Sequence, residues 1–108
     1  MAHDFTVVSG HLAPTDPGSL INWPALAKLN GTLVILMGLR QLPSIVDTLV
    51  TNGRDPATPA AIVQEGTTQY QHVVRGKLAD LPTLGNGLRP PAIVVIGDVV
   101  SALEGLQH

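Results

Sequence analysis

The chain of 108 residues contains no cysteine. This absence excludes a disulfide scaffold, thiolate-ligated metal sites and a cysteine nucleophile, and it is typical of a cytoplasmic protein. Aromatic residues are scarce as well, with one Trp, one Tyr and one Phe. The hydrophobic core must therefore be built from Val, Ile, Leu and Ala, and a hydrophobic content of 44% is enough to form one.

Charge of one sign and long apolar runs are also lacking. Six Lys and Arg against eight Asp and Glu give a formal net charge of −2. With no basic block and few aromatics for base stacking, we expect no nucleic-acid partner. Hydrophobic runs last only about five or six residues, far short of the roughly 20 that cross a membrane. The opening MAHDFTVVSG has no basic n-region or apolar h-region, so we expect no signal peptide and a cytoplasmic location.

Short apolar runs alternate with segments of helical period, which predicts an α/β fold. A close pair of strands around Glu65-Gly66-Thr67-Thr68 indicates an antiparallel hairpin, so we predict a mixed, mostly parallel sheet of about five strands with flanking helices. The last strand could continue through Val99 and Val100. The predicted strands cover 5–9, 32–37, 60–64, 70–78 and 92–96, and the predicted helices cover 23–29, 42–50 and 79–84.

The junction Met37-Gly38, where a buried strand passes into a helix, is the first candidate site. Ligands bind beyond the carboxyl ends of strands in open α/β sheets, and a glycine lets a ligand approach the backbone. The alternative is a tight bend at Gly38 with Met37 filling the core, and spacing alone favours it. Neither GxGxxG nor GxxxxGK[ST] occurs in the sequence, so no dinucleotide or P-loop fingerprint is present.

Other chemistry-bearing residues give weaker signals. The turn Glu65-Gly66-Thr67-Thr68 offers N–H and O–H donors to a polar ligand, but it also reads as an ordinary hairpin turn. His11 follows a glycine at a strand end and could face a pocket. The carboxylates are scattered, so no catalytic acid or base can be assigned. No metal-ligand spacing connects the four histidines, and we predict no metal site; they are His3, His11, His72 and His108.

Five sequence blocks in order are more specific than any single motif. They are VVSGH, TLVILMGL, TPAAIVQEGTTQYQ, VVRGKL and PPAIVVIGDVV. Together they resemble the C-terminal half of uroporphyrinogen-III C-methyltransferases, in the tetrapyrrole methylase family. The resemblance runs from Phe5 to about Val100, which is nearly the whole chain.

The resemblance implies S-adenosylmethionine as methyl donor and a cyclic tetrapyrrole as substrate. Its product would be precorrin-2, formed from uroporphyrinogen III by methylation of two ring carbons for cobalamin or sirohaem synthesis. Residues 1–108 would be the C-terminal domain of such a methylase, with the N-terminal domain absent. One domain supplies one wall of the donor cleft, so the resemblance implies that the chain is inactive alone and that the full-length protein is a homodimer.

Five residues match donor-binding positions of the family. Met37 lies in the Met-Gly block, Gly66 and Thr67 lie in the Glu-Gly-Thr block, and Ala92 and Ile93 lie in the Pro-Ala-Ile block. We therefore predict a donor site made from three separate segments of the chain.

The substrate side of the site is defined by fewer residues. Arg40 follows the Met-Gly turn closely and is the basic residue predicted to meet a substrate carboxylate. Leu36 stands where the family often has a tyrosine, which leaves open a methylase for another corrin precursor. A binding or dimerisation module without activity is the alternative from a different class.

Overall fold

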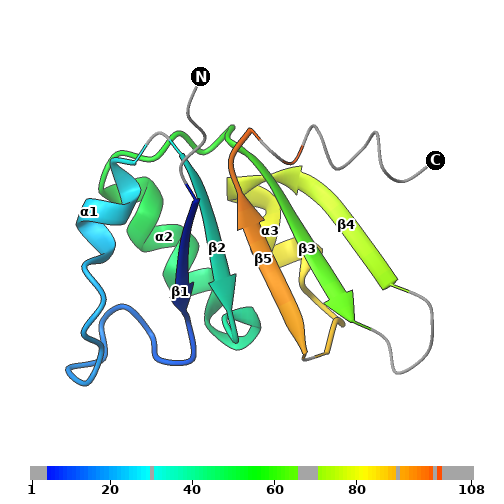
Figure 1. Cartoon of the computed structure of the whole chain (residues 1–108), viewed down its shortest axis with the longest axis horizontal. Helices are drawn as coiled ribbons and strands as arrows, with labels where there is room; N and C mark the ends of the chain where they lie inside the picture. The colour runs from blue at the N-terminus through cyan, green and yellow to red at the C-terminus, as the bar shows by residue number, and fades with distance from the viewer. Residues whose placement is uncertain (1–4, 30, 66–70, 90, 99, 101–108) are drawn as a thin grey trace.

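The computed structural model describes residues 5–29, 31–65, 71–89, 91–98 and 100. A five-stranded sheet forms its centre, with strand order β1-β2-β5-β3-β4 (Figure 1). The strands are β1 (Phe5–Ser9), β2 (Thr32–Leu36), β3 (Pro59–Glu65), β4 (Gln71–Lys77) and β5 (Ala92–Ile96). The helices are α1 (Trp23–Ala27), α2 (Leu42–Thr51) and α3 (Leu81–Leu84), with 3₁₀ turns η1 (Leu39–Gln41) and η2 (Leu78–Asp80).

The predicted five-stranded mixed sheet and its hairpin are confirmed, but the expectation of a mostly parallel sheet is wrong. Among the strands that the structure describes, only β1 and β2 pair in parallel, while β2–β5, β5–β3 and β3–β4 are antiparallel. The strands β2 and β3 do run in the same direction, because each is antiparallel to β5. They are not neighbours, since β5 inserts between them. A strand that returns from the far end of the chain cannot be placed from the local pattern of strands and helices.

The helices lie over one face of the sheet (Figure 1). Trp23 of α1, Ile45 and Leu49 of α2, and Leu33 and Ile35 of β2 belong to one buried hydrophobic cluster. The apolar positions of α2 recur every three or four residues, which places them on one side of the helix. The opposite face of β1 carries Phe5 and Val7, which are 58% and 59% exposed.

The expected local signals set two helix boundaries, the start of α1 and the end of α2. The predicted helix 23–29 ends earlier, at Ala27, and the predicted helix 79–84 is divided into η2 and α3. The side chain of Asn22 accepts a hydrogen bond of 3.1 Å from the amide of Ala25 and so caps α1. Gly53 has φ of +114° just after α2, a conformation that favours glycine. The predicted extension of the last strand does not occur at Val100, which is buried but lies outside any strand; Val99 lies outside the described residues.

A buried arginine fixes the connection between α1 and β2. Arg54 donates hydrogen bonds to the carbonyls of Leu29 and Gly31. Desolvation lowers the pKa of its guanidinium, and the nearby negative charge of Asp98 partly opposes this. The arginine therefore links the end of α2 to the start of the sheet. Within the described ranges, no helix has the length and apolar character needed to cross a bilayer.

Candidate functional site

Two strand ends meet at the candidate site. Because β1 and β2 are parallel, the residues that follow them emerge at the same edge of the sheet. The amide of Gly10 donates to the carbonyl of Leu36 at 2.7 Å. A Cβ atom added at Gly10 would lie 2.7 Å from Cγ2 of Ile35 and 2.9 Å from Cα of Gly38. The two glycines thus let the two backbones pack directly on one another.

Gly38 has the structural role that the spacing suggested, and Met37 does not. A Cβ added at Gly38 would lie 2.6 Å from Cγ2 of Ile35, so its missing side chain makes room for the core. Met37, however, is 64% exposed and does not fill the core. It also has φ of +58°, the left-handed region that a side chain disfavours by about 1–2 kcal/mol. Backbone strain of this kind concentrates at functional sites.

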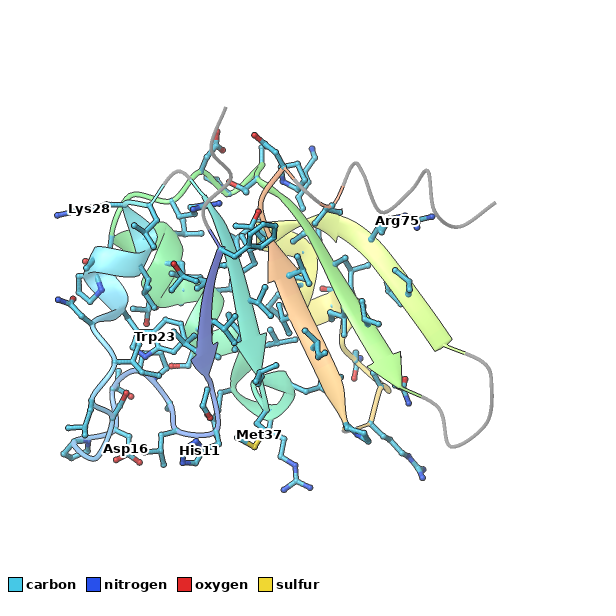
Figure 2. The ribbon with its side chains drawn as sticks, in the orientation of Figure 1. His11, Asp16, Trp23, Lys28, Met37 and Arg75 are labelled. Atoms are coloured by element: carbon cyan, nitrogen blue, oxygen red, sulfur yellow. The ribbon has the colours of Figure 1, made fainter. Side chains whose placement is uncertain are left out.

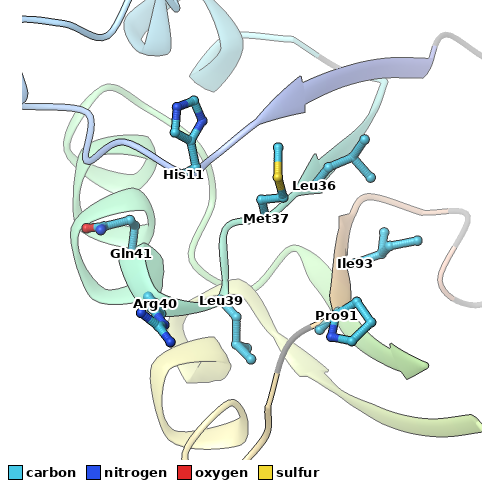
Figure 3. A pocket seen from close by; sticks show the side chains of 9 residues that line it. His11, Leu36, Met37, Leu39, Arg40, Gln41, Pro91 and Ile93 are labelled. Atoms are coloured by element: carbon cyan, nitrogen blue, oxygen red, sulfur yellow. The ribbon is translucent and has the colours of Figure 1, made fainter. Parts of the chain in front are cut away.

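An open pocket of about 760 Å³ surrounds this turn (Figure 3). Its walls come from residues at or just after the ends of β1 and β2, from the turn η1 and from the start of β5. The end of β2 and the start of β5 lie together because antiparallel pairing sets Leu36 opposite Ile93. One part of the lining is apolar and the other is polar or basic. The apolar residues are Leu36, Met37, Leu39, Pro91, Ala92 and Ile93, and the polar ones are His11, Arg40 and Gln41.

His11 is the clearest addition to the predicted site. It lines the pocket together with Met37, and both lie at the same end of the sheet (Figure 2). Its Nδ1 lies 2.9 Å from Oγ of Ser9. The glycine before it at a strand end was the sequence signal. Leu39, Gln41 and Pro91 were not predicted as lining residues. The only sequence signal for them is that they lie within four residues of Met37 or next to Ala92.

The fold brings four of the six predicted site residues together. Met37, Arg40, Ala92 and Ile93 all line the pocket, although more than fifty residues of sequence separate Arg40 from Ala92. The other two, Gly66 and Thr67, lie outside the described residues. Among the described residues, no group of three His, Asp or Glu side chains could hold a metal ion.

The chain belongs to the tetrapyrrole methylase family, because the family model for "Tetrapyrrole (Corrin/Porphyrin) Methylases" matches residues 2–82. The predicted family resemblance is thereby confirmed.

Two similar proteins of known activity show which members of the family this chain resembles. A siroheme synthase of Psychromonas ingrahamii is 48% identical over 105 residues, which are 97% of this chain but 22% of that protein. An S-adenosyl-L-methionine-dependent uroporphyrinogen III methyltransferase of Methanosarcina barkeri is 41% identical over 97 residues, covering 88% of this chain and 38% of that protein. The chain therefore spans only a minor part of the relatives it matches.

Solved structures agree on the fold. Uroporphyrin-III C-methyl transferase from Thermus thermophilus, complexed with S-adenyl homocysteine, superimposes with a TM-score of 0.75 at 33% identity. The match covers 94% of this chain and 44% of that one. The native form of the same enzyme gives the same TM-score and identity, with 43% of its chain covered.

Proposed function

We propose that this chain is one wall of the active site of an S-adenosylmethionine-dependent methyltransferase that converts uroporphyrinogen III to precorrin-2. The observation that supports this most is the pocket. Three residues at which the family resemblance implies donor binding, Met37, Ala92 and Ile93, line one cavity although Met37 is far from the other two in the sequence. Chance would not be expected to gather them.

The described lining suits such a donor. Bound there, S-adenosylmethionine would supply a methyl group on an already activated sulfonium. The apolar side chains of Met37, Pro91 and Ile93 would hold its less polar parts, and a pocket of about 760 Å³ lies in the usual range for small-molecule sites. No acid-base pair is needed for the transfer itself, since alignment of reactants can supply about 7–11 kcal/mol of a barrier. The predicted roles of Gly66 and Thr67 in donor binding remain part of this proposal.

The polar side of the pocket would receive the substrate. A uroporphyrinogen-like tetrapyrrole carries many carboxylates, and Arg40 is a guanidinium on the pocket wall. Arginine pairs with carboxylates through two parallel hydrogen bonds. We expect Arg40→Ala in the two-domain protein to raise the substrate KM with little change in kcat, and Arg40→Lys to raise it less. An unchanged KM in Arg40→Ala would remove this role.

Half a cleft cannot enclose the donor, so the chain alone is expected to be inactive. Calorimetric titration with S-adenosylmethionine should show no more than weak binding by the 108-residue chain and micromolar binding by a protein that includes the N-terminal methylase domain. The variant Met37→Ala should weaken binding by the longer protein, and Leu20→Ala, at a fully exposed position away from the pocket lining, is the matched control. Micromolar binding by the short chain would contradict the proposal that it is half a site.

A second candidate is a binding or dimerisation module without activity of its own. Phe5 and Val7 favour it, because two large apolar side chains stand exposed on the edge strand β1. An apolar edge strand is a common place for pairing between chains. Light scattering across a hundredfold range of concentration tests for the homodimer, and Val7→Lys should shift the chain toward monomer. A monomer at every concentration would argue against this candidate for the chain.

The tetrapyrrole substrate itself is part of the proposal. Leu36 on the pocket wall supplies no hydroxyl where a tyrosine could stand, so a methylase for another corrin precursor is the alternative. Assay of the two-domain protein on uroporphyrinogen III decides between them. Turnover to a dimethylated product supports the proposal, and absence of methylation favours the alternative. A cytoplasmic location likewise stays a prediction.

A further inference from the structure

Ser9 and His11 form a side-chain pair at the edge of the pocket. The Oγ of Ser9 and the Nδ1 of His11 are 2.9 Å apart, a normal hydrogen-bond distance. Figure 3 shows the His11 ring beside the pocket that Met37, Arg40 and Ile93 line. The hydrogen bond is therefore placed to set the orientation and the tautomer of the imidazole that faces a ligand in the pocket.

The backbone between the two residues holds them in this arrangement. Gly10 is buried, its amide donates to the carbonyl of Leu36 at 2.7 Å, and its Cα packs on Gly38. The link between Ser9 and His11 is thus tied to the end of β2. A side-chain hydrogen bond on so constrained a link loses less conformational entropy than the same bond on a free loop.

The direction of the hydrogen bond follows from basicity. A hydroxyl can donate or accept, whereas a neutral imidazole nitrogen accepts only when it carries no proton. An imidazole nitrogen is far more basic than a hydroxyl oxygen, so O–H···N is the stronger of the two arrangements. Ser9 donating to Nδ1 leaves the proton of the neutral ring on Nε2, since the hydrogen bond at one nitrogen sets the state of the other.

We propose that Ser9 is a positioning residue that donates to Nδ1 of His11 and holds the neutral imidazole as an Nε2–H donor for an anionic group of the ligand. This rests on the proposed function for the kind of ligand, a polycarboxylate, but the tautomer itself does not depend on it. The net strength of one neutral hydrogen bond corresponds to a tautomer preference of about 2–10-fold.

Nitrogen NMR of the unliganded chain tests this assignment. Long-range proton–nitrogen correlations of the His11 ring, recorded at a pH where the imidazole is neutral, distinguish the two tautomers. The wild-type chain should carry its proton on Nε2. The variant Ser9→Ala should lower that preference by about 2–10-fold, Ser9→Thr should keep it because the hydroxyl remains, and Ser44→Ala should leave it unchanged.

The result that would overturn the proposal is a wild-type ring with its proton on Nδ1, or a Ser9→Ala ring with the wild-type tautomer ratio. If Ser9→Ala does not give the dispersed spectrum of a folded chain, the wild-type tautomer and a Ser9→Cys variant, whose thiol is a weaker donor, decide instead. If the tautomer result contradicts the role of Ser9, the methyltransferase proposal is unaffected. Failure of the longer protein to bind S-adenosylmethionine would leave the Ser9–His11 result intact.

Discussion

A methyl group added at Gly10 tests the contact on which the pocket depends. In Gly10→Ala, the new Cβ would lie 2.7 Å from Cγ2 of Ile35 and 2.9 Å from the backbone of Gly38. Ile35 is fully buried, and a backbone atom cannot turn aside as a flexible side chain can. Overpacking a well-filled core costs about 1–3 kcal/mol. For a chain of this length, that corresponds to a fall in Tm of roughly 4–24 °C.

Urea unfolding followed by tryptophan fluorescence measures this loss. Trp23 is the single tryptophan and is 1% exposed, so its emission reports the folded core. The matched control is Gly18→Ala, where the added Cβ would come no closer than 3.2 Å, to a carboxylate oxygen of Asp16. The reasoning would be refuted if Gly10→Ala were destabilised by less than about 0.5 kcal/mol, the usual range for surface changes.

Three further predictions concern other parts of the fold, each measured by the same urea unfolding. Asn22→Ala removes the cap of α1 and should cost about 0.5–2 kcal/mol, with Asn22→Asp close to wild type. Arg54→Met leaves two main-chain carbonyls without their donor and should cost about 2–4 kcal/mol; the same loss near pH 6 and pH 8 is expected because a guanidinium is charged at both. Met37→Gly relieves the positive φ and should leave the chain as stable as wild type or up to about 1 kcal/mol more stable. Met37→Ala keeps a Cβ atom and should give no such gain in stability. A destabilised Met37→Gly would show that the exposed side chain has a packing role.

The sequence predicted the local elements well because their signals are local. Asn22 caps α1, Gly53 follows α2, and the periodic apolar residues of α2 face the sheet. Direction and order of the strands are not local properties. The predicted mixed sheet is confirmed, but the expectation that it is mostly parallel was wrong, because β5 enters between β2 and β3 and is antiparallel to both.

In the candidate site, too, local sequence signals predicted some features and the tertiary structure decided others. Residue spacing favoured a core position for Met37, and the family resemblance shifted the balance toward a ligand site. The structure exposes Met37 in a left-handed turn, while Gly38 serves the packing of Ile35. A single backbone torsion decides whether the side chain points inward or outward, and no pattern of apolar residues encodes that torsion.

By itself, the sequence determined the family, the elements and the absence of cysteine chemistry, because these depend on residue type and order alone. The tertiary structure decided which residues share the pocket. Met37 and Ile93 line one pocket because β2 and β5 pair in antiparallel. His11 lines it too because β1 and β2 run in parallel and Gly10 packs on Gly38. Such strand pairings are set by packing between residues far apart in the sequence, so a local sequence pattern does not predict them.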